Sequence, residues 1–328
     1  MEFEQHTIFS PMNRHITGWV VAAAVFALSG LAMNGQAVCG QAMAAETKIV
    51  ASIAPLHGIV ASLTQGIAKP HLLLAPGASP HSFTLRPSDA RALNRADLIV
   101  WVGPALENFL TRPLRSLTGR TRLLTLSEIE GIKKLPARGG EHGAHNHAGH
   151  NHTASRGIDP HLWLSPDNAK AIARAVTARL TELAPADAGR YGENLSRTLA
   201  RIDKTRRDIE VLLAPVNKMP FMTFHDAFQY FERAFGLNSA GWIAIDAGRR
   251  PSAKRLSALR RTLRKSRARC LFSEPQFPSA LLKTVTEGTS ARIAPLDPLG
   301  AEIDTGPTHW HTMMIGMGRS LRDCLLQR

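Results

Sequence analysis

Short apolar runs alternate with helical segments along most of this chain, and this alternation constrains the fold more than any other sequence feature. The run Leu98-Ile-Val-Trp-Val102 is continuously apolar, which is typical of a strand buried on both faces of a parallel sheet. Strands that alternate with helices indicate an α/β fold built from mainly parallel sheets. The predicted strands are 48–53, 71–74, 98–102 and 122–126 in the first half, and 220–224, 240–245, 268–272 and 292–296 in the second.

A long amphipathic stretch separates these two groups of strands. Ser165-Pro166-Asp167 has the hydroxyl, proline and acid of a helix start, and this helix ends before Pro185. From Asp187 to Leu213 apolar residues recur at helical spacing, which at about 1.5 Å per residue gives a helix of roughly 40 Å. We predict two lobes, each a mainly parallel sheet flanked by helices, joined by this linking helix. The predicted boundaries are 45–186, 187–214 for the linking helix and 215–328, with further helices at 56–63, near 87, at 252–265 and from 307 onward.

The first 44 residues have the features of an export signal. Gly18–Met33 is an apolar run, and Ala42-Met43-Ala44 has the small-residue spacing of a cleavage site. The run of 16 residues is short for a membrane span, so an uncleaved anchor is the less favoured alternative. We predict that residues 1–44 are a cleaved signal peptide and that the rest of the chain is exported.

Export places the cysteines in an oxidising compartment, where paired thiols favour a disulfide. The chain has three cysteines, and Cys39 lies in the segment predicted to be removed. Cys270 and Cys324 remain as an even pair, for which a disulfide is the natural assignment and two buried thiols are the alternative.

The net charge of +14 raises the question of nucleic-acid binding. The basic residues argue against it, because they are spread over helical faces such as 254–269 without interleaved aromatic residues or a nucleic-acid motif. An exported protein also rarely meets nucleic acid. We predict no nucleic-acid partner and attribute the charge to solubility and to attraction toward an anionic membrane surface.

A histidine-rich stretch at about 138–157 has no explanation in packing. The gaps between its histidines hold Gly, Ala and Asn instead of the apolar residues that a helix or strand face needs. Neutral imidazole is a good ligand for Zn, Cu or Ni, so a short histidine-rich tract indicates metal handling. We predict an auxiliary metal-binding loop, with a solvated insertion as the alternative. Its five histidines are His142, His145, His147, His150 and His152.

Three other histidines and one aspartate stand at the ends of predicted strands or in the loops beside them. His81 follows Pro76-Gly-Ala-Ser-Pro80, His225 closes a strand, and Asp297 follows the last strand. His161 precedes the helix start at 165. Ligands of open α/β sheets bind outside the carboxyl ends of the strands. No short metal motif connects these residues, and each by itself is more often a capping or core residue.

Five further polar residues invite a role but have ordinary explanations as well. His57 follows the first strand, and a structural role is favoured over a transient metal contact. Glu274 is either an acceptor that orients an imidazole or a surface acid. Asp226 is expected to cap the helix after His225. His309 and His311 are expected at the surface or at a helix start.

Several motifs, in this order along the chain, resemble those of the periplasmic zinc receptor and zinc-binding lipoprotein family, the substrate-binding proteins of zinc ABC importers. The resemblance covers roughly 46–328, and the histidine-rich loop fits the zinc branch of that family. The motifs are Pro76-Gly-Ala-Ser-Pro-His81, Leu85-Arg-Pro-Ser-Asp89, Asp159-Pro-His-Leu-Trp-Leu-Ser-Pro166, Thr223-Phe-His-Asp-Ala-Phe228, Phe272-Ser-Glu-Pro-Gln-Phe277 and Leu296-Asp-Pro-Leu-Gly300.

The resemblance implies a metal site shared by the two lobes. His81 and His161 come from the first lobe, His225 comes from the second, and Asp297 occupies the place of a fourth ligand that water can replace. Manganese relatives have a carboxylate where His225 stands, and three imidazoles favour zinc because manganese prefers oxygen ligands. Pro80 is a departure, since some zinc members carry a carboxylate there.

The function implied is that of a zinc receptor that captures Zn²⁺ in the periplasm and delivers it to a membrane permease and, through it, to an ATPase. Such a receptor is a monomer and not an enzyme, and a bridge between Cys270 and Cys324 matches one seen in some members. A manganese receptor of the same family is one alternative. A zinc hydrolase is another, because three histidines with an open position suit an activated water, although no motif supplies a general base.

Overall fold

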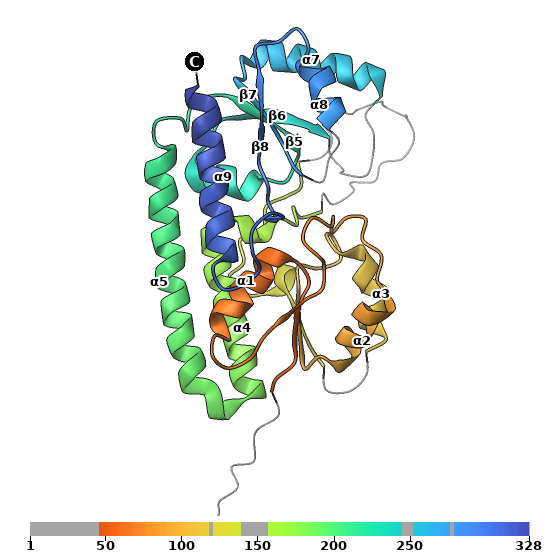
Figure 1. Ribbon diagram of the computed structural model, residues 1–328, viewed down its shortest axis with the longest axis vertical. Coiled ribbons are helices and arrows are strands. Elements are labelled where there is room, and N and C mark those ends of the chain that lie inside the picture. The colour runs from red at the N-terminus through yellow and green to blue at the C-terminus, as the bar shows by residue number, and fades with distance from the viewer. Residues whose placement is uncertain (1–45, 118–120, 139–156, 245–251, 276–278, 328) are drawn as a thin grey trace, which may run out of the picture. The chain divides into compact units, whose positions relative to one another are not determined.

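The computed structural model describes residues 46–117, 121–138, 157–244, 252–275 and 279–327 (Figure 1). The predicted signal peptide at 1–44 and the five histidines of the histidine-rich stretch lie outside the described residues. Among the described helices, none combines the length and the apolar character that crossing a membrane requires.

Four strands of the first half form one parallel sheet. They are β1 (Ile49–Ala51), β2 (His71–Leu72), β3 (Leu98–Trp101) and β4 (Arg122–Thr125), in the order β2-β1-β3-β4. The central strands β1 and β3 are buried at every position, as expected of strands covered on both faces. The four strands predicted from apolar runs in this half are therefore confirmed.

The second half repeats this arrangement. Its strands β5 (Phe221–His225), β6 (Ser239–Ala244), β7 (Cys270–Ser273) and β8 (Arg292–Pro295) are also parallel, in the order β6-β5-β7-β8. Both sheets therefore have the same connectivity, and β5 occupies the central position that β1 has in the first sheet. Two parallel sheets flanked by helices confirm the predicted fold class.

The helices that connect the strands cover the sheets (Figure 1). The predicted helix start at Ser165 is confirmed, because the Ser165 hydroxyl accepts a hydrogen bond from the Asn168 N–H. The helices are α1 (Ala54–Leu63), α2 (Pro87–Arg95), α3 (Thr111–Arg115), α4 (Pro166–Leu183), α5 (Ala188–Leu213), α6 (Gln229–Phe235), α7 (Ala253–Ser266), α8 (Ser279–Thr286) and α9 (His309–Leu326).

The predicted linking helix is present as α5, a helix of 26 residues. It follows α4 after a short 3-10 turn at Pro185–Asp187 and packs against α4, α9 and α1. Its buried positions recur every three or four residues and end with Thr205, Ile209 and Leu213. The exact limits of the two lobes on either side of it stay a prediction.

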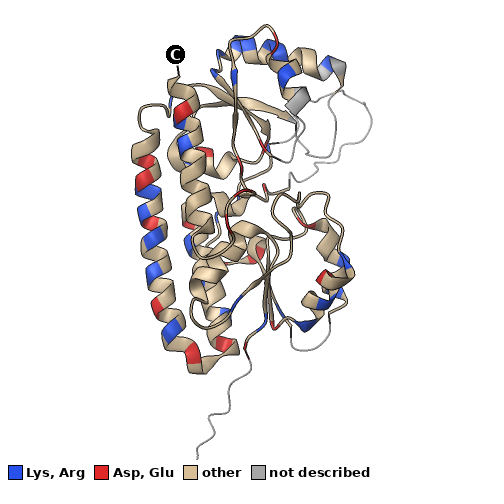
Figure 2. Cartoon of the chain, in the orientation of Figure 1, with Lys and Arg blue, Asp and Glu red and all other residues tan. Residues whose placement is uncertain are grey.

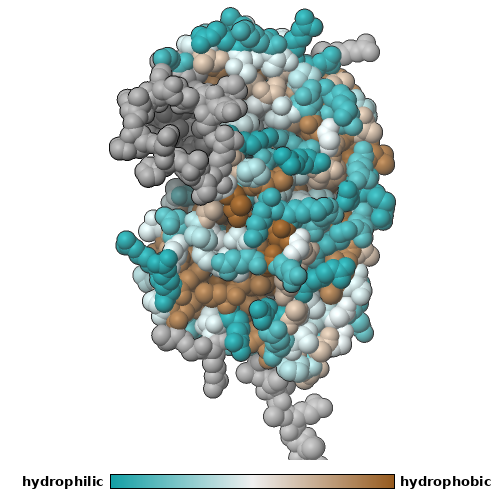
Figure 3. All heavy atoms as spheres, turned by 180° about the vertical axis from the view of Figure 1, so that it is seen from behind, coloured by the Kyte–Doolittle hydropathy of each residue, from teal (hydrophilic) through white to brown (hydrophobic). Residues whose placement is uncertain are grey.

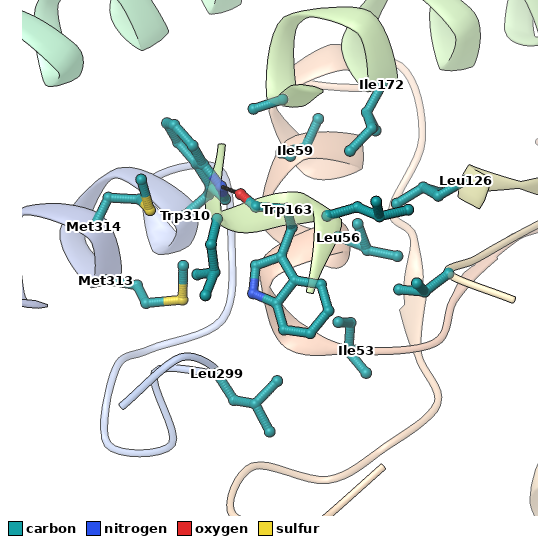
Figure 4. Packing of buried hydrophobic residues seen from close by; sticks show 14 of the residues in the cluster. Ile53, Leu56, Ile59, Leu126, Trp163, Ile172, Leu299, Trp310, Met313 and Met314 are labelled. Carbon is teal, nitrogen blue, oxygen red and sulfur yellow. Dashed lines mark hydrogen bonds between the residues drawn. The ribbon is translucent and has the colours of Figure 1, made fainter. Parts of the chain in front are cut away.

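Two tryptophans connect the first half of the chain to α9 and to the loop before it (Figure 4). Trp163 and Trp310 are each only 1% exposed. The Trp163 indole N–H donates to the Pro298 carbonyl at 2.8 Å, and the Trp310 indole N–H donates to the Trp163 carbonyl at 2.9 Å. Because Trp163 lies two residues after His161 and Pro298 follows Asp297, these bonds fix two of the segments that carry candidate ligands.

A disulfide joins Cys270, at the start of β7, to Cys324 in α9. Both cysteines are buried. The bond closes a loop with a sequence separation of 54 and ties the last helix to the second sheet, and the predicted pairing is confirmed.

The charged residues are spread over the surface, as the sequence predicts (Figure 2). Acidic and basic residues mix along α5, where Lys204 pairs with Asp208 and Arg206 with Glu210. In contrast, α7 carries basic residues and no acidic one. The face seen from behind is largely hydrophilic, with hydrophobic residues gathered in part of its lower half (Figure 3).

Candidate metal centre

His81, His161 and His225 come together although they are far apart in the sequence. His81 lies between β2 and α2, His161 precedes the 3-10 turn Leu162–Leu164, and His225 is the last residue of β5. Each offers one ring nitrogen, and these nitrogens lie within 4.8 Å of one another. The ring centroids are 5.1 to 5.8 Å apart. In the described part of the chain, this is the one group of three or more potential ligand residues that meets this distance.

The three imidazoles differ in their access to solvent. His161 and His225 are each 4% exposed, whereas His81 is exposed. The buried pair is held by the surrounding core, and His81 is carried by a loop. Two of the three ligands are therefore held in place by the core, and the centre is open to solvent at His81.

Asp159 orients His161. Its Oδ1 accepts the His161 backbone N–H at 3.0 Å and lies 2.7 Å from the His161 Nδ1. A carboxylate at Nδ1 favours the tautomer with the proton on that nitrogen, which leaves the lone pair of Nε2 for a metal. The following turn is held by Asn168, whose side-chain amide donates to the Leu162 carbonyl at 3.2 Å.

Glu274 has the same relation to His225. It directly follows β7, is 6% exposed, and places Oε2 at 3.4 Å from the His225 Nδ1. Burial lowers the pKa of His225, but the hydrogen bond and the charge of Glu274 act in the opposite direction and the net effect is a raised pKa. Glu274 is therefore a buried acceptor that orients the His225 imidazole, and the alternative of a surface acid is wrong.

Asp297 lies outside this group. Its Oδ1 accepts the Leu299 N–H at 2.9 Å and its Oδ2 accepts the Ala301 N–H at 2.5 Å, so both carboxylate oxygens are bonded to the loop that follows. The described residues thus bring together three nitrogen ligands without the predicted fourth one. A role for Asp297 in coordination stays a prediction.

Three other histidines are buried but belong to the scaffold. His57 in α1 places Nε2 at 3.1 Å from the Pro70 carbonyl, and burial lowers the pKa of its imidazole. His309 and His311 were expected at the surface or at a helix start, and they lie at the start of α9, where they are buried with exposures of 0% and 7%. The ring nitrogens of His309 face two loop carbonyls, and the His311 Nδ1 is 3.0 Å from the Thr205 hydroxyl. Burial lowers the pKa of His311 to about 4.

The expectation that Asp226 caps the next helix is wrong. The residue before α6 is Phe228, and no side chain caps this helix. The Asp226 carboxylate instead accepts hydrogen bonds from Arg138. Arg138 carries no signal in the sequence, since its partners Asp226 and Glu232 lie 88 and 94 positions away.

A groove of about 810 Å³ between β4 and α4 lies elsewhere on the first half. Its lining includes Leu124, Ile129, Ala171 and Arg174 and none of the three histidines. The candidate metal centre is therefore defined by converging ligands and not by this groove.

The chain has two parallel sheets of equal connectivity with a long helix packed beside them. Together with three imidazoles from both halves of the chain, these features define a class: a two-sheet α/β protein with a candidate metal centre shared by its two halves. The sequence decides the family within that class. Residues 49–324 match the family described as zinc-uptake complex component A, periplasmic, and the chain belongs to this family. The resemblance predicted from the sequence motifs is thus confirmed.

Individual relatives agree with this assignment. The high-affinity zinc uptake system protein ZnuA of Brucella abortus (strain 2308) is 37% identical over 304 residues, which cover 84% of this chain and 91% of the relative. A zinc-bound deletion mutant of ZnuA has a TM-score of 0.72 at 23% identity, covering 86% of this chain and 99% of that one. FpvC of Pseudomonas aeruginosa in complex with Mn²⁺ has a TM-score of 0.72 at 21% identity, covering 85% and 98%. These solved structures show the shared fold.

Proposed function

We propose that this protein is the zinc-binding receptor of a zinc ABC importer, which captures Zn²⁺ in the periplasm and delivers it to the membrane permease and, through it, to the ATPase. The observation that carries the proposal is the convergence of His81, His161 and His225, whose ligand atoms lie within 4.8 Å of one another. The name of the relatives, high-affinity zinc uptake system protein, supports the same role.

The donor set favours zinc over manganese. Zinc accepts three imidazole nitrogens in a tetrahedral site with one open position, whereas manganese prefers carboxylate, carbonyl and water oxygens. Asp159 and Glu274 reach the Nδ1 atoms of His161 and His225, so these two carboxylates act as acceptors behind the ligands. Asp297 or a water molecule completes the coordination, and the histidine-rich stretch supplies weaker additional sites.

The arrangement also suits a protein that must release its ion. Zinc bound by ligands from both halves crosslinks the two sheets, while α5 and the buried tryptophans limit how far they separate. His81 is the exposed ligand on a loop, so we expect it to bind last and to leave first. The permease can then distinguish the loaded from the empty monomer by the positions of the loops around the centre.

The proposal assigns no catalysis to this centre. An open zinc position could activate water, which keeps a zinc hydrolase as the alternative. A hydrolase needs a general base beside that water, and the nearby carboxylates Asp159 and Glu274 are engaged with imidazoles. Hydrolysis of activated esters by the zinc-loaded protein above the rate of free zinc would favour the alternative.

Growth of a receptor-deficient bacterial strain in low-zinc medium tests the function. The full chain should restore growth, and His225→Ala should not, although it is exported normally. His71→Ala is the matched control, because His71 is exposed and lies outside the three-histidine group, and it should restore growth fully. Normal growth with His225→Ala, or rescue in low-manganese and not in low-zinc medium, would contradict the proposal.

A further inference from the structure

The described base of the histidine-rich stretch is a short antiparallel ribbon, which we call the stem. It consists of residues 135–138 and 157–159, with a bridge between Pro136 and Ile158. The stem ends at Asp159, the residue that orients His161. Its backbone hydrogen bonds run from the Ala137 N–H to the Gly157 carbonyl and from the Asp159 N–H to the Leu135 carbonyl, both at 2.8 Å.

Side chains of α6 fasten both strands of the stem to the second half of the protein. The Tyr230 hydroxyl accepts the Leu135 N–H at 2.9 Å and donates to the Asp159 carbonyl at 3.0 Å. The Gln229 side-chain amide donates to the Pro136 carbonyl at 3.2 Å. These bonds join a segment that belongs to the first half to the helix that follows His225.

Arg138 adds the strongest of these contacts. Its Nε–H donates to the Asp226 Oδ1 at 3.0 Å, and its Nη1 donates to the Glu232 Oε2 at 2.5 Å. The two carboxylates are 9% and 7% exposed, and the guanidinium lies 4.7 Å from the centre of the Trp242 ring. A guanidinium can serve two carboxylates and an aromatic face at once because its donors lie in a planar fork.

Two of the residues that take part in these contacts are neighbours of the candidate metal ligands. Asp226 directly follows His225, and Asp159 is bonded to the His161 imidazole. The stem, which ends beside His161, is therefore held by the segment that carries the ligand of the other half. Such a link aligns ligands from both halves before the ion arrives, which lowers the cost of ordering them on binding.

We infer that Arg138 is a positioning residue of the metal centre, which holds the stem and His161 in register with His225 in the metal-free protein. This inference rests on the proposed function, because it assumes that the three histidines bind zinc. Lysine cannot replace it fully, since an ammonium group lacks the fork that meets both carboxylates.

Zinc titration of the metal-free protein in competition with a chromophoric chelator tests this role. Arg138→Ala should weaken the tight site by about tenfold or more, as loss of groups behind metal ligands does. Arg138→Lys should recover part of that loss. The matched control is Arg206→Ala, which also bridges two carboxylates, Asp167 and Glu210, but on the exposed face of α5. The zinc affinity of Arg206→Ala should stay within about twofold of the native value.

A double-mutant cycle separates alignment from general destabilisation. If Arg138 acts by aligning the two halves, its removal should cost almost nothing further in a protein that already lacks His225. Additive losses in Arg138→Ala and His225→Ala would show that Arg138 only stabilises the fold, and would overturn the inference. Native affinity in His225→Ala alone would instead contradict the proposed function.

Tyr230→Phe keeps the inference testable if Arg138→Ala fails to fold, because it breaks two bonds of the stem without leaving a buried charge. We expect faster hydrogen exchange of the Leu135 amide together with a severalfold loss of zinc affinity. Faster exchange with native zinc affinity would mean that the stem is fastened for stability alone, and the inference would be wrong.

Discussion

Replacement of Asp159 by asparagine should weaken zinc binding while leaving the fold intact. Asp159 lies 2.7 Å from the His161 Nδ1 and is only 4% exposed, so its charge acts on the imidazole with little screening by water. A hydrogen bond to a charged group contributes about 1.5–3 kcal/mol. Because about 1.4 kcal/mol corresponds to a tenfold change in affinity, Asp159→Asn should weaken the tight zinc site by about 10- to 100-fold.

Competition between the protein and a chromophoric chelator measures this loss. Asp167→Asn is the matched control, because Asp167 is an acid of the same half that pairs with Lys133 and Arg206 at the surface. Its loss should change zinc affinity by less than about twofold. If Asp159→Asn is folded and binds zinc as tightly as the native protein, the reasoning about imidazole orientation is refuted.

Three further predictions concern the disulfide and the titration of histidines. Cys270 and Cys324 should resist thiol reagents until reductant is added, and replacement of both by serine should lower the free energy of unfolding by about 4 kcal/mol, measured with urea. Burial lowers the pKa of His225, but the hydrogen bond and charge of Glu274, together with the charges of Asp226 and Asp159, raise it overall. Protons should therefore displace zinc as the pH falls through about 6.5, and Glu274→Gln should move this loss to lower pH in a pH series of titrations. Flat affinity down to about pH 5 would contradict a three-imidazole site. Burial holds the pKa of His311 at about 4, below that of the unfolded chain, so its contribution to stability is complete above about pH 6.5 and is lost toward pH 4. The free energy of unfolding of His311→Gln, measured with urea, should therefore depend less on pH in that range than that of the native protein.

The sheets and the linking helix could be predicted because local pattern determines them. The eight predicted strands centre on short apolar runs, and apolar residues recur at helical spacing along α5, with Thr205 between Ile202 and Ile209. Two short helices were not predicted. α3 spans five residues that include Pro113, and α8 contains the β-branched Thr284, Val285 and Thr286, so local propensity is weak and tertiary contacts decide.

The candidate site divides in the same way. His81, His161 and His225 could be selected because each stands at a strand end or in a recognisable motif, and the structure brings them together. The surroundings of polar side chains could not be predicted, because their partners are distant in sequence. Asp226 pairs with Arg138 instead of capping a helix, and His311, although it stands at the expected helix start, is buried against Thr205.

The most direct test of the account is a zinc titration of two variants side by side, one lacking residues 141–152 and one carrying His225→Ala. The tight site is expected at His81, His161 and His225, and only weaker sites are expected in the histidine-rich stretch. The deletion variant should therefore keep a single tight site and lose weak ones, whereas His225→Ala should lose the tight site and keep the weak ones. If the tight site disappears with residues 141–152 and survives His225→Ala, the metal centre is not where the three imidazoles converge.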